Sequence, residues 1–123
     1  MIRVLIADDN PDVRELLREV LQSEDCQVLE AADGKEALER TRLNHPDVVL
    51  LDLQMPVMDG FSVIQQLKQD PRYATIPVAA VTAYAMRGDR ERALAAGFDD
   101  YITKPIHPAS LRHSIEMLLA GRP

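Results

Sequence analysis

The strongest constraint on the fold of this chain comes from short strand-like segments that each end in a charged side chain. These segments are residues 2–7, 48–51 and 100–103, and the charged residues after them are Asp8, Asp9, Asp52 and Lys104. The first two segments are apolar with little alternation, which is typical of strands covered on both faces. In an open parallel sheet the carboxyl ends of the strands meet at one crevice, so we expect the four charged groups to lie together there.

Strand and helix patterns alternate along the whole chain. We expect strands at residues 2–7, 27–31, 47–52, 78–82 and around 101–102, and helices opening at Pro11, at Asp33-Gly34, near Phe61 and near Arg87, with a last one carrying Leu111, Ile115, Leu118 and Leu119. Asn10 is the expected cap of the first helix, whose apolar stripe is Val13, Leu16, Leu17, Val20 and Leu21. Five strands alternating with five helices predict an α/β fold, a doubly wound parallel sheet with helices on both faces.

The bulk properties limit the class of protein. The 123 residues suffice for one domain, and no apolar stretch approaches the roughly 20 residues of a membrane span. The N-terminal segment enters a strand without a secretory-signal layout, so we expect a cytoplasmic protein. The single cysteine, Cys26, excludes an intramolecular disulfide, and the net charge of −6 argues against non-specific nucleic-acid binding.

The three carboxylates suggest a metal and a phosphoryl group. Asp52 is the candidate nucleophile, because a carboxylate can attack phosphorus and form an aspartyl-phosphate. Asp8 and Asp9 leave a neighbouring strand and can reach the same ion, and the backbone carbonyl of Gln54 can add a ligand. Such an oxygen donor set suits Mg²⁺. The alternative is that the acid pair merely caps the first helix, which is tenable for Asp9 alone.

Two further side chains can contact a phosphoryl group at this edge. Lys104 offers a compact positive charge. The alternative of a surface lysine is weakened by Pro105, because an X-Pro bond can be cis and a cis bond usually marks a functional or tight turn. Thr82 ends the fourth strand, where its hydroxyl can donate to a phosphoryl oxygen.

The ordered set of these motifs resembles the receiver domain of two-component response regulators. The motifs are Asp8-Asp9, residues 51–60, Val81-Thr82-Ala83 and residues 101–105, and the resemblance covers essentially the whole chain. It implies a flavodoxin-like sheet with strand order 2-1-3-4-5. Residues 1–123 would then be one receiver domain with no output domain, and a strand beginning at Ile2 favours a natural start.

The resemblance also implies roles for individual residues. The implied Mg²⁺ ligands are Asp8, Asp9, Asp52 and the Gln54 carbonyl, the implied phosphoryl-oxygen contacts are Thr82 and Lys104, and the implied aromatic switch residue is Tyr101. The phosphoryl group would come to Asp52 from a histidine kinase or a histidine phosphotransfer protein. Gln54 and Tyr84 occupy the two positions that tune phosphoryl lifetime in similar proteins, and we expect the bulky Tyr84 to block water and prolong it.

The resulting prediction is a signalling switch that acts on a downstream protein target or in a phosphorelay, with no enzymatic activity beyond its own phosphorylation and dephosphorylation. The alternatives are a binding-only receiver, the receiver part of a hybrid histidine kinase, and a Mg²⁺-dependent phosphatase. Gln54 stands where such phosphatases carry a second acid, which argues against the last. A nucleotide-binding module lacks its glycine-rich motif. Residues 93–96, three alanines and Leu94, fit either a dimer face or packing on the sheet.

Overall fold

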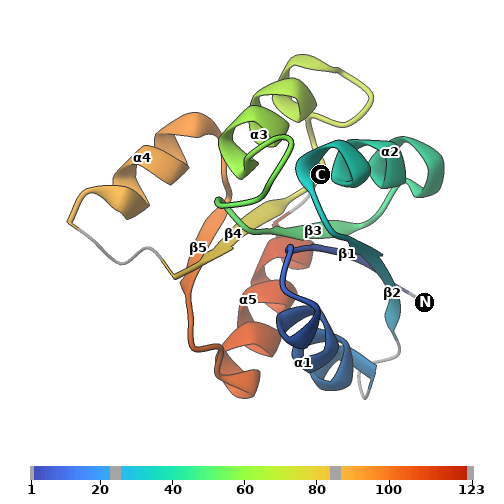
Figure 1. Cartoon of the computed structure of the whole chain (residues 1–123), viewed down its shortest axis with the longest axis vertical. Helices are drawn as coiled ribbons and strands as arrows, with labels where there is room; N and C mark the ends of the chain where they lie inside the picture. Colours follow the sequence, from blue (N-terminus) through green and yellow to red (C-terminus); the bar gives the residue numbers. More distant parts are fainter. Residues whose placement is uncertain (1, 23–25, 84–86, 122–123) are drawn as a thin grey trace.

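The computed structural model describes residues 2–22, 26–83 and 87–121 and contains one five-stranded sheet (Figure 1). The strands are β1 (Ile2–Ala7), β2 (Cys26–Ala31), β3 (Val48–Leu51), β4 (Val78–Thr82) and β5 (Asp100–Thr103). They lie in the order β2-β1-β3-β4-β5, and all neighbours are parallel. The predicted fold class and strand order are therefore confirmed.

Helices cover both faces of the sheet. They are α1 (Pro11–Gln22), α2 (Gly34–Asn44), α3 (Gly60–Gln69), α4 (Asp89–Ala96) and α5 (Pro108–Ala120). Figure 1 shows α1 and α5 on one face and α2, α3 and α4 on the other. Each face has its own core: Leu5 and Val49 belong to the cluster under α2 and α3, whereas Ile6 and Leu50 belong to the cluster under α1 and α5. Successive residues of one strand thus enter different cores, which explains the unbroken apolar runs.

Side-chain caps start three of the helices directly beyond the carboxyl edge of the sheet. Asn10 Oδ1 accepts the Asp12 N–H at 2.9 Å. Asp33 and Asp59 accept amide N–H groups two residues inside α2 and α3, each at 2.8 Å. Such caps satisfy amide groups that have no partner inside the helix. The N-termini of these helices therefore surround the same edge as the charged residues.

Two helices differ in detail from the sequence prediction. α4 begins at Asp89 rather than near Arg87, because Gly88 has a left-handed backbone with φ of 89°. In this helix Ala93 is buried, but Leu94 is 40% exposed and residues 95–96 are exposed, so packing on the sheet explains Ala93 alone. The stripe of α1 is also narrower than expected, since Leu16 is 42% exposed. None of the helices in the described ranges has the length and apolar character needed to span a membrane.

Candidate functional site

The carboxyl edge of the sheet gathers three carboxylates. Asp8 follows β1 and Asp52 follows β3, and their side chains are 3% and 7% exposed. Asp9, the next residue after Asp8, is exposed. One carboxylate oxygen from each of the three lies within 4.8 Å of the others. The fold thus brings together acids that are more than forty residues apart in the sequence.

Lys104 bridges the two buried carboxylates. Its Nζ donates to Asp8 Oδ2 at 2.8 Å and to Asp52 Oδ2 at 3.2 Å. The backbone N–H of Lys104 donates to the carbonyl of Thr82 at 2.9 Å. This bond fixes the position of the Lys104 backbone beside the end of β4. The side chain is 21% exposed, so Lys104 is not a solvated surface lysine. The Lys104–Pro105 peptide bond is cis.

The remaining oxygens of the buried carboxylates are held by their own loops. Asp8 Oδ1 accepts the Asn10 N–H at 2.9 Å, and Asp52 Oδ1 accepts the Gln54 N–H at 3.1 Å. The two acids therefore have fixed orientations without any partner molecule. Thr82 is fully buried at the end of β4, between the strands that carry Asp52 and Lys104.

Burial and neighbouring charges both shift the pKa values of Asp52 and Lys104. Burial raises the pKa of Asp52, the Gln54 N–H opposes the rise, the Asp8 charge adds to it, and Lys104 opposes it, leaving the pKa above its usual value. Burial by itself would lower the pKa of Lys104, but the hydrogen bond to Asp8 and the charges of Asp52 and Asp8 outweigh burial and raise it. The lysine therefore stays charged at neutral pH, and a further cation would stabilise the ionised carboxylates.

The donor set fits a hard divalent cation. All three side chains offer carboxylate oxygens, which Mg²⁺ and Ca²⁺ prefer, and no thiol or imidazole belongs to the cluster of described acids. Three carboxylates face one ammonium group, so the site carries spare negative charge that a cation can neutralise. The cluster is thus able to hold a metal ion.

Comparison with known proteins identifies the family. The model of the response regulator receiver domain matches residues 4–116. The chain belongs to the response regulator receiver domain family. The polar-differentiation response regulator DivK of Brucella ovis is 41% identical over 103 residues, which cover 84% of each chain.

Solved structures agree with this receiver assignment. The receiver domain of a signal transduction histidine kinase from Syntrophus aciditrophicus is 35% identical, with a TM-score of 0.90 and coverage of 98% of this chain and 92% of that one. The receiver domain of a sensor histidine kinase from Pseudomonas aeruginosa is 31% identical, with a TM-score of 0.90 and 98% coverage of both chains, and holds a magnesium ion coordinated in its active-site cleft.

In this receiver domain the aromatic residue Tyr101 is buried. The side chain is 9% exposed and packs in the core cluster under α2 and α3. Burial raises the pKa of its phenol, the charge of Asp89 raises it further, and Arg92 opposes the rise. Arg92 in turn pairs with Asp89 at 2.8 Å. Tyr84, the second expected lifetime residue, lies outside the described residues.

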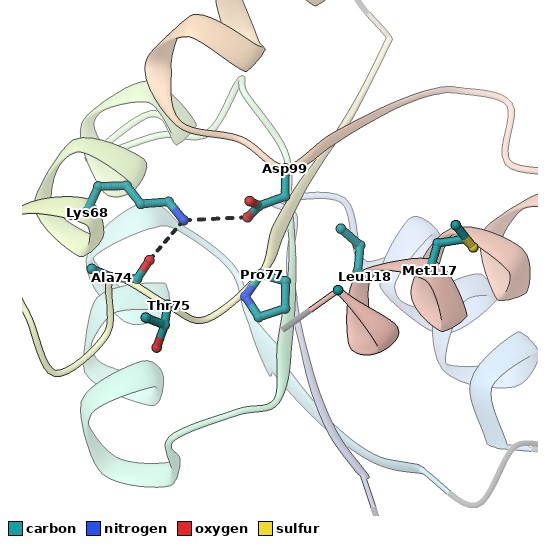
Figure 2. A pocket seen from close by; sticks show the side chains of 8 residues that line it. Lys68, Ala74, Thr75, Pro77, Asp99, Met117 and Leu118 are labelled. Atoms are coloured by element: carbon teal, nitrogen blue, oxygen red, sulfur yellow. Dashed lines mark hydrogen bonds and ion pairs between the residues drawn. The ribbon is translucent and has the colours of Figure 1, made fainter. Parts of the chain in front are cut away.

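A separate cavity lies at the opposite edge of the sheet (Figure 2). It measures about 260 Å³, and its lining includes Pro77, which precedes β4, and Asp99, which precedes β5. Figure 2 shows the Lys68 ammonium group pointing to Asp99 and to the Ala74 carbonyl, at 3.5 and 3.1 Å. Asp99 also accepts the Val78 N–H at 2.8 Å. The two charged residues that line this cavity, Lys68 and Asp99, pair with each other. The cavity therefore lacks the excess negative charge of the carboxyl edge.

The sequence patterns did not predict one contact at the carboxyl edge. Arg14 of α1 donates from Nη1 to the backbone carbonyl of Asp8 at 2.6 Å and from Nε to Glu30 of β2 at 3.2 Å. No spacing rule connects these residues, because Glu30 reaches Arg14 only through the pairing of β1 with β2. Within the sequence, the only sign of this contact was an arginine, Arg14, in the first turn of the first helix.

Proposed function

We propose that this protein is a phosphorylation-activated signalling switch whose phosphoryl acceptor is Asp52. The observation that carries the proposal is the placement of the Asp52 carboxylate: it is buried, 3.2 Å from the Lys104 ammonium group, and within 4.8 Å of two further acids. A structural ion pair needs one acid, whereas phosphoryl transfer needs a nucleophile and positive charge for the phosphoryl oxygens. The family supports the same reading.

In the proposed reaction, a carboxylate oxygen of Asp52 attacks the phosphorus of a phosphohistidine on a kinase or phosphotransfer protein. The new oxygen–phosphorus bond forms as the phosphorus–nitrogen bond breaks, and the imidazole nitrogen takes the electron pair. Lys104 donates to one phosphoryl oxygen, and the Thr82 hydroxyl donates to another. Mg²⁺ would be held by Asp8, Asp9, Asp52 and the Gln54 carbonyl, and when bound it neutralises negative charge on the phosphoryl oxygens.

The signal in this proposal is a shift between two populations. Phosphorylation adds charge and acceptors beside Thr82, which ends β4, and the neighbouring strand carries Tyr101. A movement of Thr82 toward the phosphoryl group changes the space available to the Tyr101 ring and so the surface formed by α4, β5 and α5. A downstream protein target then reads that surface. Gln54 and Tyr84 are proposed to set how fast water removes the phosphoryl group.

The test is intact mass spectrometry after incubation with acetyl phosphate, with and without Mg²⁺. Wild type should gain the mass of one phosphoryl group only when Mg²⁺ is present, and Asp52→Asn should gain none. Asp99→Asn is the matched control, because it removes a carboxylate at the opposite edge and should behave as wild type. No gain in wild type under any condition would refute the proposal and favour a receiver that only binds partners.

A further inference from the structure

We infer that Arg14 is a positioning residue that orients the Asp8-Asp9 pair for a divalent cation. The inference rests on the proposed function, because it concerns the same metal site. It starts from the backbone of Asp8, the residue at which the chain leaves the sheet. The Asp8 N–H still follows the strand pairing and donates to Ala31 O at 3.0 Å, whereas the Asp8 carbonyl accepts from the Arg14 side chain instead.

The Arg14 guanidinium holds that carbonyl from a fixed place. Its Nη1 lies 2.6 Å from Asp8 O, and its Nε lies 3.2 Å from Glu30 Oε1. Glu30 is itself held by Arg18, one turn further along α1, at 2.6 Å. The Arg14 side chain is only 18% exposed. A planar guanidinium with two ends engaged has little rotational freedom, so it acts as a rigid brace between α1, β2 and the loop after β1.

The carbonyl that Arg14 holds belongs to the peptide plane between Asp8 and Asp9. Fixing the oxygen of that plane fixes the direction in which the backbone enters Asp9. The Asp8 carboxylate has its own anchors, Asn10 and Lys104, but Asp9 is exposed. The brace therefore matters most for Asp9, which must point toward the other two carboxylates to share an ion with them. Groups that orient metal ligands typically change metal affinity by about 10- to 100-fold when removed.

The charge of Arg14 and its positioning role predict opposite changes in Mg²⁺ affinity when Arg14 is removed. Removing a positive charge near a cation site strengthens cation binding if only Coulomb repulsion acts. Removing the brace weakens binding, because the peptide plane before Asp9 gains freedom. Arg14→Gln tests both effects at once, whereas Arg14→Lys keeps the charge and loses the two-ended guanidinium contact. Arg18→Gln is the matched control, since it removes an arginine that also contacts Glu30 but is not bonded to Asp8.

The experiment is calorimetric titration of each variant of the 123-residue chain with MgCl₂ at neutral pH, with circular dichroism as the check of folding. We expect Arg14→Lys and Arg14→Gln to bind Mg²⁺ about 10-fold more weakly than wild type and Arg18→Gln to match wild type. Glu30→Gln removes the ion pair that holds Arg14 but leaves Arg14 able to bond the Asp8 carbonyl. Its Mg²⁺ affinity should therefore lie between that of the Arg14 variants and that of wild type. This variant keeps the test decisive if an Arg14 substitution does not fold.

Phosphoryl uptake from acetyl phosphate separates positioning from a general structural role. At low Mg²⁺ the rate for Arg14→Lys should fall in proportion to its weaker binding, and at saturating Mg²⁺ it should return to the wild-type rate. Wild-type Mg²⁺ affinity in both Arg14 variants, or equal losses in Arg14→Lys and Arg18→Gln, would overturn the inference while leaving the proposed function intact. A wild type that binds no Mg²⁺ would instead overturn the proposed metal site itself.

Discussion

The two edges of the sheet contain the same kinds of charged groups in a different balance. At the carboxyl edge, Lys104 lies between two carboxylate side chains that are 3% and 7% exposed, with a third acid nearby. At the opposite edge, Lys68 meets one carboxylate, Asp99, whose side chain is 41% exposed and which also accepts a backbone N–H. The second pair is matched and partly solvated, so it serves the structure.

The difference teaches that function depends on charge that the fold leaves unmatched. An exposed ion pair with balanced charges contributes little to stability, so removing it changes the free energy of unfolding only slightly. Buried acids of like charge are costly to keep ionised, and the raised pKa of Asp52 records that cost. A protein that retains such acids at one edge gains a place where a cation binds favourably.

The largest difference between the edges should appear when Lys104 and Lys68 are substituted separately. Lys104→Met removes the donor proposed to contact the phosphoryl group, and we expect its rate of phosphoryl uptake from acetyl phosphate to fall roughly 100-fold at saturating Mg²⁺. Lys68→Met, at the opposite edge, should leave the rate unchanged. Mass spectrometry over time gives both rates. Equal rates in the two variants would end the distinction between the edges.

A smaller effect is expected for stability, where the same substitution should have opposite signs at the two edges. Asp52 has a raised pKa in the folded protein, so its contribution to stability is present below the unfolded pKa and is lost as pH rises. In Mg²⁺-free buffer at pH 7, Asp52→Asn should therefore raise Tm by a few degrees, about 1 kcal/mol for a domain of this size. Asp99→Asn should lower Tm slightly, because it weakens the pair with Lys68.

The pH and metal dependence of this stability difference can be measured by thermal unfolding. The advantage of Asp52→Asn should shrink as pH falls toward the ordinary aspartate pKa of about 3.9. Mg²⁺ at 100 times its dissociation constant should stabilise wild type by about 2.7 kcal/mol and reverse the order of the two proteins. An advantage of Asp52→Asn that persisted at low pH would show that its origin is not the Asp52 charge.

The smallest effect should come from the two non-glycine residues with positive φ in the described part of the chain. Val57, in the loop after Asp52, has φ of 70° and is 77% exposed, while the Met58 N–H bonds across it to Pro56 O at 2.7 Å. A β-branched residue is strained in this region. Val57→Gly should therefore stabilise the protein by about 0.5 kcal/mol, after the entropy cost of glycine.

His45 provides the matched comparison at the opposite edge. Its φ is 47°, but it caps α2 through its N–H to Thr41 O, and its ring lies near Tyr73. His45→Gly relieves strain and loses those ring contacts, so we expect no gain. Urea unfolding at matched conditions gives both values. A stabilised His45→Gly, or a destabilised Val57→Gly, would show that strain is not concentrated at the carboxyl edge.

Much of the fold followed from local patterns. The apolar runs, the capping residue Asn10 and the helix opening at Asp33-Gly34 indicated helix and strand positions close to those observed. The start of α4 was placed too early because the positive φ of Gly88 leaves no trace in helix periodicity. The sequence pattern also did not predict the exposure of Leu94, because a short helix buries only one narrow side against its neighbours.

The sequence by itself determined which edge carries the site, because parallel strands direct their carboxyl ends to one side and Asp8, Asp52 and Lys104 each follow such an end. Only the tertiary structure decided the contacts within it. Lys104 reaches Asp8 across 96 residues of sequence, Arg14 bonds both the Asp8 carbonyl and Glu30, and Tyr101 packs inward. These contacts depend on side-chain directions and on distances between elements, which local patterns do not contain.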